Sequence, residues 1–178
     1  MHLAGIAFTQ SAASEICITN FMNRKDLVIA PAGEAFLLLV VGLAGWLTHQ
    51  PLVFASLGPT AYELIETPHR RSAQPYSIFI GHLTGVAAGY LALAMTAAWT
   101  APTSSLNGVP LLRVLAVVIA TALTVFGTIL LRASQPAAIS TSMLIAMGIM
   151  SAPRDAIVIV ASVSIMIAVG EPLRRFRL

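Results

Sequence analysis

Apolar positions divide most of the chain into four long runs, at about 32–50, 76–98, 110–131 and 155–171. Each run is close to the roughly 20 residues that an α-helix needs to cross about 30 Å of hydrocarbon. Apolar and polar residues do not alternate with a period of two, so the pattern excludes a β-barrel. The pattern predicts an all-α polytopic membrane protein with four long transmembrane helices.

Two shorter apolar runs, at about 52–65 and 136–150, lie between the long ones. Pro or Gly interrupts each of them near its start, and only two to four helical turns follow the interruption. The first break reads Ser56-Leu57-Gly58-Pro59-Thr60-Ala61 and the second reads Ser134-Gln135-Pro136-Ala137-Ala138. Broken hydrophobic segments at matching places in two halves of a membrane protein point to a transport site.

The two breaks are about 78 residues apart, and a similar spacing relates Pro31 to Pro110 and Pro75 to Pro153. This spacing predicts an internal repeat in which each half is a long helix, a short broken helix and a long helix. The resulting segments are an N-terminal arm or interfacial helix at 1–30, repeat 1 at 31–98, a connecting loop at 99–109, repeat 2 at 110–171 and a basic C-terminal tail at 172–178.

The composition agrees with a membrane protein and indicates which kind of partner to expect. The chain is 57% hydrophobic and 10% charged, with a mean hydropathy of +0.86, whereas soluble domains carry about 25% charged residues. The ten Lys and Arg residues lie at the ends of apolar segments and form no basic face, so we expect the lipid bilayer and not nucleic acid as a partner. Cys17 is the single cysteine, which excludes an intrachain disulfide.

The short segments could either cross the membrane or dip in and return on the same side. If they return, six of the ten Lys and Arg residues lie inside; if they cross, eight lie inside and two, Arg113 and Arg154, lie outside. Positive charge favours the cytoplasmic side of short loops, so the count favours crossing. Crossing predicts an inverted repeat of three plus three spans in the cell (inner) membrane, with cytoplasmic N- and C-termini.

The chemistry of the breaks points to a small anion. A Pro near the start of a helix replaces one of the N–H groups that would otherwise be free there, and the remaining free N–H groups carry partial positive charge. In an inverted repeat two such starts would face each other near the membrane midplane. The alternative is that both breaks are kinks whose polar groups are satisfied by neighbouring helices. The candidate substrate-binding residues are Ser56, Gly58, Pro59, Thr60, Ala61, Ser134, Gln135, Pro136, Ala137 and Ala138.

Two ionisable residues within the apolar runs are further candidates. His82 should face the bundle interior or water, where it could gate, shuttle a proton or simply bond a backbone carbonyl. Glu63 lies in the first short run, and we favour the interpretation that it extends to the membrane interface. The stripe Gly81-x3-Gly85-x3-Gly89 suits close packing of helices. No pattern of metal ligands, phosphate loop or catalytic residues occurs, so the sequence predicts no metal, no cofactor and no enzyme.

Four motifs together resemble the HPP family of small integral membrane proteins, over roughly residues 34 to 170. They are the first break at 56–61, then Ala73-Gln74-Pro75, then Gly81-His82-Leu83, then Pro136-Ala137-Ala138. The naming motif of the family, His-Pro-Pro followed by Ala and Gly, here reads Ser134-Gln135-Pro136-Ala137-Ala138, and Pro59 stands where an Ala is usual. Family members are usually described with four membrane spans, and some in cyanobacteria and chloroplasts are linked to nitrite transport. The resemblance therefore implies passage of nitrite or a similar anion.

The sequence leaves two classes of function open. The first is a transporter or channel for a small monovalent anion, with His82 as a titratable neighbour of the site; a chain of this size cannot easily enclose a pore alone, so we expect a homo-oligomer. The second is a membrane scaffold or accessory subunit that does not transport, in which the breaks are purely structural.

Overall fold

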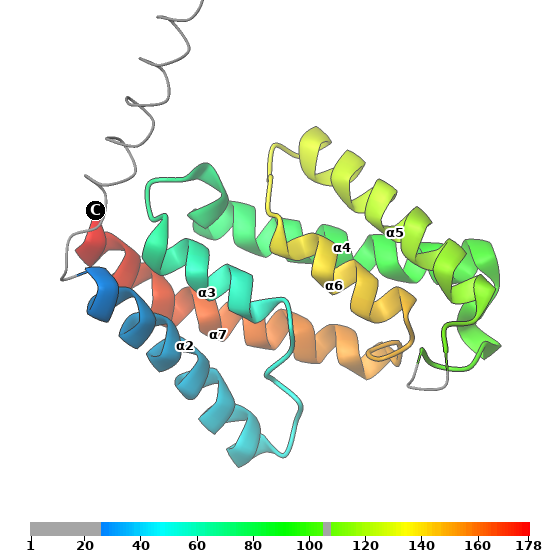
Figure 1. Cartoon of the computed structure of the whole chain (residues 1–178), viewed down its shortest axis with the longest axis horizontal. Coiled ribbons are helices and arrows are strands. Elements are labelled where there is room, and N and C mark those ends of the chain that lie inside the picture. Colours follow the sequence, from blue (N-terminus) through cyan, green and yellow to red (C-terminus); the bar gives the residue numbers. More distant parts are fainter. Residues whose placement is uncertain (1–25, 105–107) are drawn as a thin grey trace, which may run out of the picture.

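The computed structural model describes residues 26–104 and 108–178, and within them it is helical with no β-strand. Four helices are long and apolar enough to cross a membrane, which confirms the predicted fold class. Two helices of ten residues lie between them, in the order shown in Figure 1. The helices are α2 (Asp26–Thr48), α3 (Leu57–Glu66), α4 (Pro75–Thr96), α5 (Leu111–Leu130), α6 (Ala137–Ala146) and α7 (Pro153–Arg177), with 3-10 turns η1 (Arg71–Ala73) and η2 (Ala98–Thr100).

Helix boundaries follow the breaks in the sequence closely, with two exceptions. The short helices begin at Leu57 and Ala137, within two residues of Pro59 and Pro136. However, α2 begins at Asp26 and keeps Pro31 inside it, so the helix extends into the segment expected to be an arm; residues 1–25 of that segment lie outside the described residues. The expected C-terminal tail continues α7 as far as Arg177, past Pro172.

Contacts between helix ends define two ends of the bundle. At one end, the start of α2 packs on the end of α3, since Gly33 lies against Ile65, and α7 finishes beside them, since Arg177 Nε donates to the Ile65 carbonyl over 2.8 Å. At the other end, the Ser104 amide after α4 donates to the Met147 carbonyl after α6 over 3.0 Å. We call the first the arginine-rich end, because six described arginines lie there: Arg70, Arg71, Arg132, Arg174, Arg175 and Arg177.

Relative to these ends, consecutive helices run in opposite directions (Figure 1). α2 and α4 run away from the arginine-rich end and α3 runs toward it, whereas α5 and α7 run toward it and α6 runs away. A ten-residue helix rises about 15 Å, half of the hydrocarbon thickness, and a non-helical segment precedes each of α3 and α6. The directions are those that crossing requires, while the symmetry relation between the two halves stays a prediction.

The helices pack in two groups. α4, α5 and α6 pack closely on one another, and α2, α3 and α7 form a second group that meets the first mainly where α7 packs on α4. We call them the α4 group and the α7 group; Figure 1 shows them side by side. The last helix of each half thus packs with the first two helices of the other half. The starts of α3 and α6 lie at the boundary between the groups.

The glycine stripe of α4 brings that helix into direct contact with α6. A Cβ added at Gly85 would lie 2.5 Å from the Ala138 carbonyl oxygen, and one at Gly89 would lie 2.8 Å from Ile145 Cβ. Such distances are too short for any side chain, so only glycine permits this approach. The predicted packing role of the stripe is confirmed, and α6 is the helix against which it packs.

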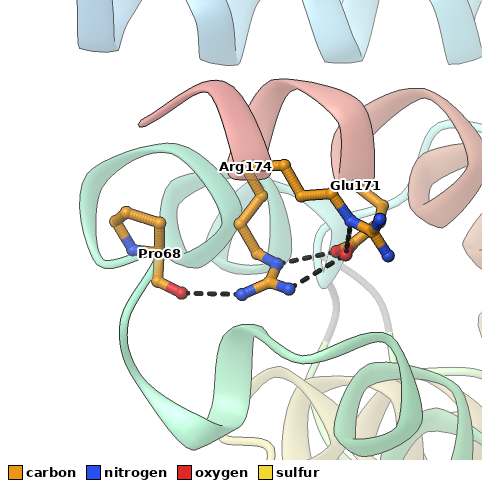
Figure 2. Close-up of polar contacts among 4 residues, drawn as sticks. Pro68, Glu171 and Arg174 are labelled. Carbon is orange, nitrogen blue, oxygen red and sulfur yellow. Dashed lines mark hydrogen bonds and ion pairs between the residues drawn. The ribbon is translucent and has the colours of Figure 1, made fainter. Parts of the chain in front are cut away.

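Arginine side chains hold the outer end of each short helix. At the arginine-rich end, Figure 2 shows Arg174 bonded through Nε and Nη2 to Glu171 and through Nη1 to the Pro68 carbonyl over 3.0 Å. At the opposite end, Arg113 donates to the carbonyls of Ala101, Pro102 and Ala146, and it lacks a carboxylate partner within the described ranges. These bonds satisfy carbonyl groups that a helix end leaves free.

Candidate functional site

A closed ring of buried polar side chains lies where α3 and α6 begin. Ser56 Oγ lies 2.8 Å from Thr141 Oγ1, His82 Nδ1 lies 2.7 Å from the same Thr141 atom, and His82 Nε2 lies 3.0 Å from Thr60 Oγ1. Ser56, Thr60 and Thr141 are fully buried and His82 is 2% exposed. We call these four residues the central ring. Ser56 and Thr141 are 85 residues apart in sequence, and their contact brings the starts of the two short helices together.

All the bonds of the central ring are satisfied at once with a neutral imidazole. Thr60 Oγ1 donates to the Ser56 carbonyl over 3.0 Å, which leaves it to accept from His82 Nε2–H. The unprotonated Nδ1 then accepts from the Thr141 hydroxyl, and Thr141 accepts from Ser56. Each hydroxyl has one hydrogen to donate, so in this arrangement no donor is left over. The site is therefore closed and self-satisfied in this state.

Each member of the ring reaches the centre from a different part of the fold. Ser56 precedes α3, Thr60 lies one turn into it, and Thr141 lies one turn into α6. His82 projects from α4, next to Gly81, whose lack of a side chain leaves room for Gln135. Ser56 and Thr60 come from the α7 group, while His82 and Thr141 come from the α4 group. The ring thus joins the two helix groups.

The first turns of both short helices lie beside this ring without a side-chain cap in the part of the chain that the structure describes. In α3 the Leu57 N–H donates to the Phe54 carbonyl, and in α6 the N–H groups of Ala138 and Ile139 donate to the Gln135 and Pro136 carbonyls. The start of a helix nevertheless carries the positive end of its dipole. Both short helices direct this end toward the ring, since they run outward from it. A small anion at the ring would meet both dipoles favourably.

The predicted site residues divide into two sets. Ser56, Thr60, Ala61, Gln135, Ala137 and Ala138 are buried, and Gly58 is half-buried. Pro59, Ser134 and Pro136 are exposed, so their side chains lie outside the packed centre. Pro136 immediately precedes the first residue of α6 and Pro59 is the third residue of α3, which fits their expected role of starting helices more than a role in binding.

A second buried polar cluster lies between the central ring and the arginine-rich end. Glu63 is one turn beyond Thr60 on α3 and only 8% exposed, and Ser72 and Gln135 lie beside its carboxylate. Gln135 packs against Gly81. Ser77 lies one turn before Gly81, on the same face of α4. Among the described residues, Glu63 Oε2, Ser77 Oγ and both amide atoms of Gln135 have no hydrogen-bond partner. We call Glu63, Ser72, Ser77 and Gln135 the Glu63 cluster.

Sequence reasoning missed two of these features. Thr141 was not a candidate, although its place one turn after Ala137 matches that of Thr60 one turn after Ser56, and this spacing could have indicated it. The interpretation that Glu63 extends to the membrane interface is wrong, because Oε2 is buried. His82 bonds two threonine hydroxyls and not a backbone carbonyl. Within the described ranges, no group of three or more His, Cys, Asp or Glu side chains could hold a metal ion.

The fold and the site together define a class, that of multi-pass α-helical membrane proteins in which two half-length helices begin at a buried polar centre. The four apolar spans expose many large hydrophobic side chains, and these form the surface that faces lipid. The sequence model of the family described as HPP, transmembrane region, matches residues 19–175, so the chain belongs to this family. No curated protein and no solved structure matches the chain.

Proposed function

We propose that this chain carries a small monovalent anion of the nitrite type across the bilayer, through the centre where α3 and α6 begin. The observation that carries the proposal is the central ring: Ser56, Thr60, His82 and Thr141 converge from both helix groups on the uncapped starts of two half-length helices. Buried hydroxyl and imidazole groups are costly inside a membrane and mark substrate pathways. Membership of the HPP family supports a transport-related role.

Helix starts offer partial positive charge, which suits a weakly hydrated monovalent anion. The nearest arginines described are at the two ends, about one short helix away from the ring, so no full positive charge is available there for a divalent anion such as sulfate. We therefore expect nitrite and similar anions to be selected over sulfate and over cations.

The closed ring favours a carrier over a channel. An anion can reach the centre only if the bonds between the Ser56–Thr60 side and the His82–Thr141 side open, and these sides belong to different helix groups. Rocking of the α4 group against the α7 group would open the ring toward one end at a time, as in transporters built from repeats. We place the arginine-rich end on the cytoplasmic side of a cell membrane by its positive charge, and the homo-oligomer stays a prediction.

One observation favours the scaffold function. The ring satisfies its own hydrogen bonds, so it could serve only to join the two helix groups. The two functions differ in what happens when one ring hydroxyl is removed. A scaffold would lose stability alone, whereas a carrier would lose flux through a folded protein.

The test is uptake of nitrite by proteoliposomes that hold wild-type protein or Thr141→Val, with Thr124→Val as the matched control. Thr124 is equally buried, but its hydroxyl bonds only to the Ala120 carbonyl of its own helix. Thr141→Val removes the hydrogen bonds to Ser56 and to His82, and the loss of each costs about 0.5–1.5 kcal/mol. We therefore expect roughly five- to a hundredfold less flux for Thr141→Val and unchanged flux for Thr124→Val. Wild-type flux no greater than that of empty liposomes, with a folded sample, would favour the scaffold.

A further inference from the structure

The Glu63 cluster is not needed by the central ring, yet it places a carboxylate on the route between the ring and the arginine-rich end. Glu63 is one turn from Thr60, about 5 Å further along α3. A fixed negative charge there would repel an anion that passes between the ring and this end. The carboxylate and the proposed cargo are therefore compatible only if the charge of Glu63 changes during passage.

The surroundings of Glu63 suit a group that gains and loses a proton. Its Oε2 lacks a partner among the described residues, and so do both amide atoms of Gln135 beside it. An amide can donate to a carboxylate through Nε2 or accept from a carboxylic acid through Oε1. Buried polar groups without partners are rare in native structures and call for a ligand, an ion or water. Gln135 can thus serve both protonation states of Glu63.

Other charged groups around α3 are engaged elsewhere or lie at the surface. Arg70 supplies positive charge near the Glu63 carboxylate from an exposed position. On α7, Arg174 bonds Glu171 and Pro68, and Arg177 bonds Ile65. On α4, His82 bonds two threonines. Helix α6 has no titratable residue. Among the residues whose side chains the structure describes, the remaining titratable groups near this end are the half-buried Glu34 and the exposed Tyr62, Glu66, His69, Arg71, Tyr76, Arg132 and Arg175.

We propose that Glu63 is the proton-binding residue of a proton-coupled anion carrier, with Gln135 positioning its carboxyl group. The inference rests on the proposed function. When the site is open to one side, the carboxylate takes one proton from that solution to form the neutral acid, and the anion can then pass it. When the site is open to the other side, the anion leaves and the acid releases the proton there. One proton and one monovalent anion move together, so no net charge crosses. Because Glu63 lies on α3 and Gln135 precedes α6, protonation changes a contact between the α7 group and the α4 group.

The test is anion uptake by proteoliposomes under an imposed proton gradient, for wild type, Glu63→Gln and the matched control Glu66→Gln. Nitrite and nitrate are both used, because nitrous acid is a weak acid that crosses bilayers as a neutral molecule, whereas nitric acid is strong and nitrate stays ionised in the assay. Empty liposomes set the background. We expect an acidic outside to raise the initial rate several-fold for wild type and Glu66→Gln. Glu63→Gln should transport at a rate that does not respond to the gradient.

A pH-sensitive dye inside wild-type vesicles tests the coupling without a variant. We expect nitrate uptake to acidify the lumen when protonophore is absent. Wild-type uptake that ignores the proton gradient, that depends on sodium instead, or that leaves lumenal pH unchanged would overturn the role of Glu63 and leave the proposed function intact. A response to the proton gradient that persists in Glu63→Gln would also overturn the role of Glu63 and leave the proposed function intact. Absence of all anion uptake would instead contradict the proposed function.

Discussion

The two short helices have the same length and start at the same place, but they are held differently. α6 is packed between α4 and α5, directly against the glycine stripe, and contains no charged residue. α3 packs on α2 and α7, makes only slight contact with α6, and carries Glu63 in its buried face. The comparison indicates that α6 is the fixed side of the site and α3 the side that can respond to ligands.

The outer ends of the two short helices also differ in the arginine side chains that bind them. Arg113 alone joins the end of α6, through the Ala146 carbonyl, to the connection between α4 and α5, through the Ala101 and Pro102 carbonyls. At the end of α3, Arg174 and Arg177 share the task, and Glu171 pairs with Arg174 and with Arg175. The bonds at the end of α3 are divided between two arginines, although the Arg174–Glu171 pair is itself largely buried, whereas the Arg113 guanidinium depends on its carbonyl partners. The end of α3 therefore depends less on a single arginine.

The first comparison concerns the packing of α6. Gly85→Ala places a Cβ 2.5 Å from the Ala138 carbonyl oxygen, whereas a Cβ at Gly58 on α3 meets no atom within 4 Å. Overpacking of a well-packed contact costs about 1–3 kcal/mol, so we expect Gly85→Ala to lower the thermal unfolding midpoint in detergent clearly and Gly58→Ala to leave it nearly unchanged. Equal midpoints for the two variants would show that α6 is not tightly fixed.

The next effect concerns the outer ends. Arg113→Ala removes three hydrogen bonds from a charged donor, and such bonds are worth about 1.5–3 kcal/mol each before losses in additivity. Arg174→Ala leaves Arg175 on Glu171 and Arg177 on Ile65. We expect Arg113→Ala to lower the free energy of unfolding, measured by denaturant titration, by more than Arg174→Ala does. The reverse order would remove the distinction between the two ends.

The third comparison concerns the ring, where each short helix supplies one threonine to His82. Thr60→Val and Thr141→Val each remove two hydrogen bonds and should each lower nitrite flux roughly five- to a hundredfold. Because both hydroxyls act through the same imidazole, we expect the double variant to lose less than the product of the two single losses. Initial rates of uptake for the four proteins measure this coupling. Losses that multiply would mean that α3 and α6 act on the anion independently.

The sequence predicts the larger part of this fold because apolar run length and Pro or Gly breaks act locally. The four spans, the two short helices and their starts near Pro59 and Pro136 all follow from such signals. It does not predict that α7 continues past Pro172, because the hydrogen bonds from Arg174 and Arg177 to Pro68 and Ile65 are contacts between distant segments. Likewise Thr141 and the burial of Glu63 depend on how α6 and α4 pack, which no local pattern records.

The central claim is that the anion passes where α3 and α6 begin, and a reversible cross-link there tests it most directly. Ser56→Cys with Thr141→Cys, in a background that lacks Cys17, places two sulfurs where the hydroxyl oxygens lie 2.8 Å apart, which is within reach of a disulfide. Nitrite uptake is measured in the same proteoliposomes after oxidation and after reduction, with each single cysteine variant as a control. We expect that the oxidised protein takes up no nitrite and that reduction restores uptake. Equal uptake in the oxidised and reduced states, with the disulfide verified, would contradict it.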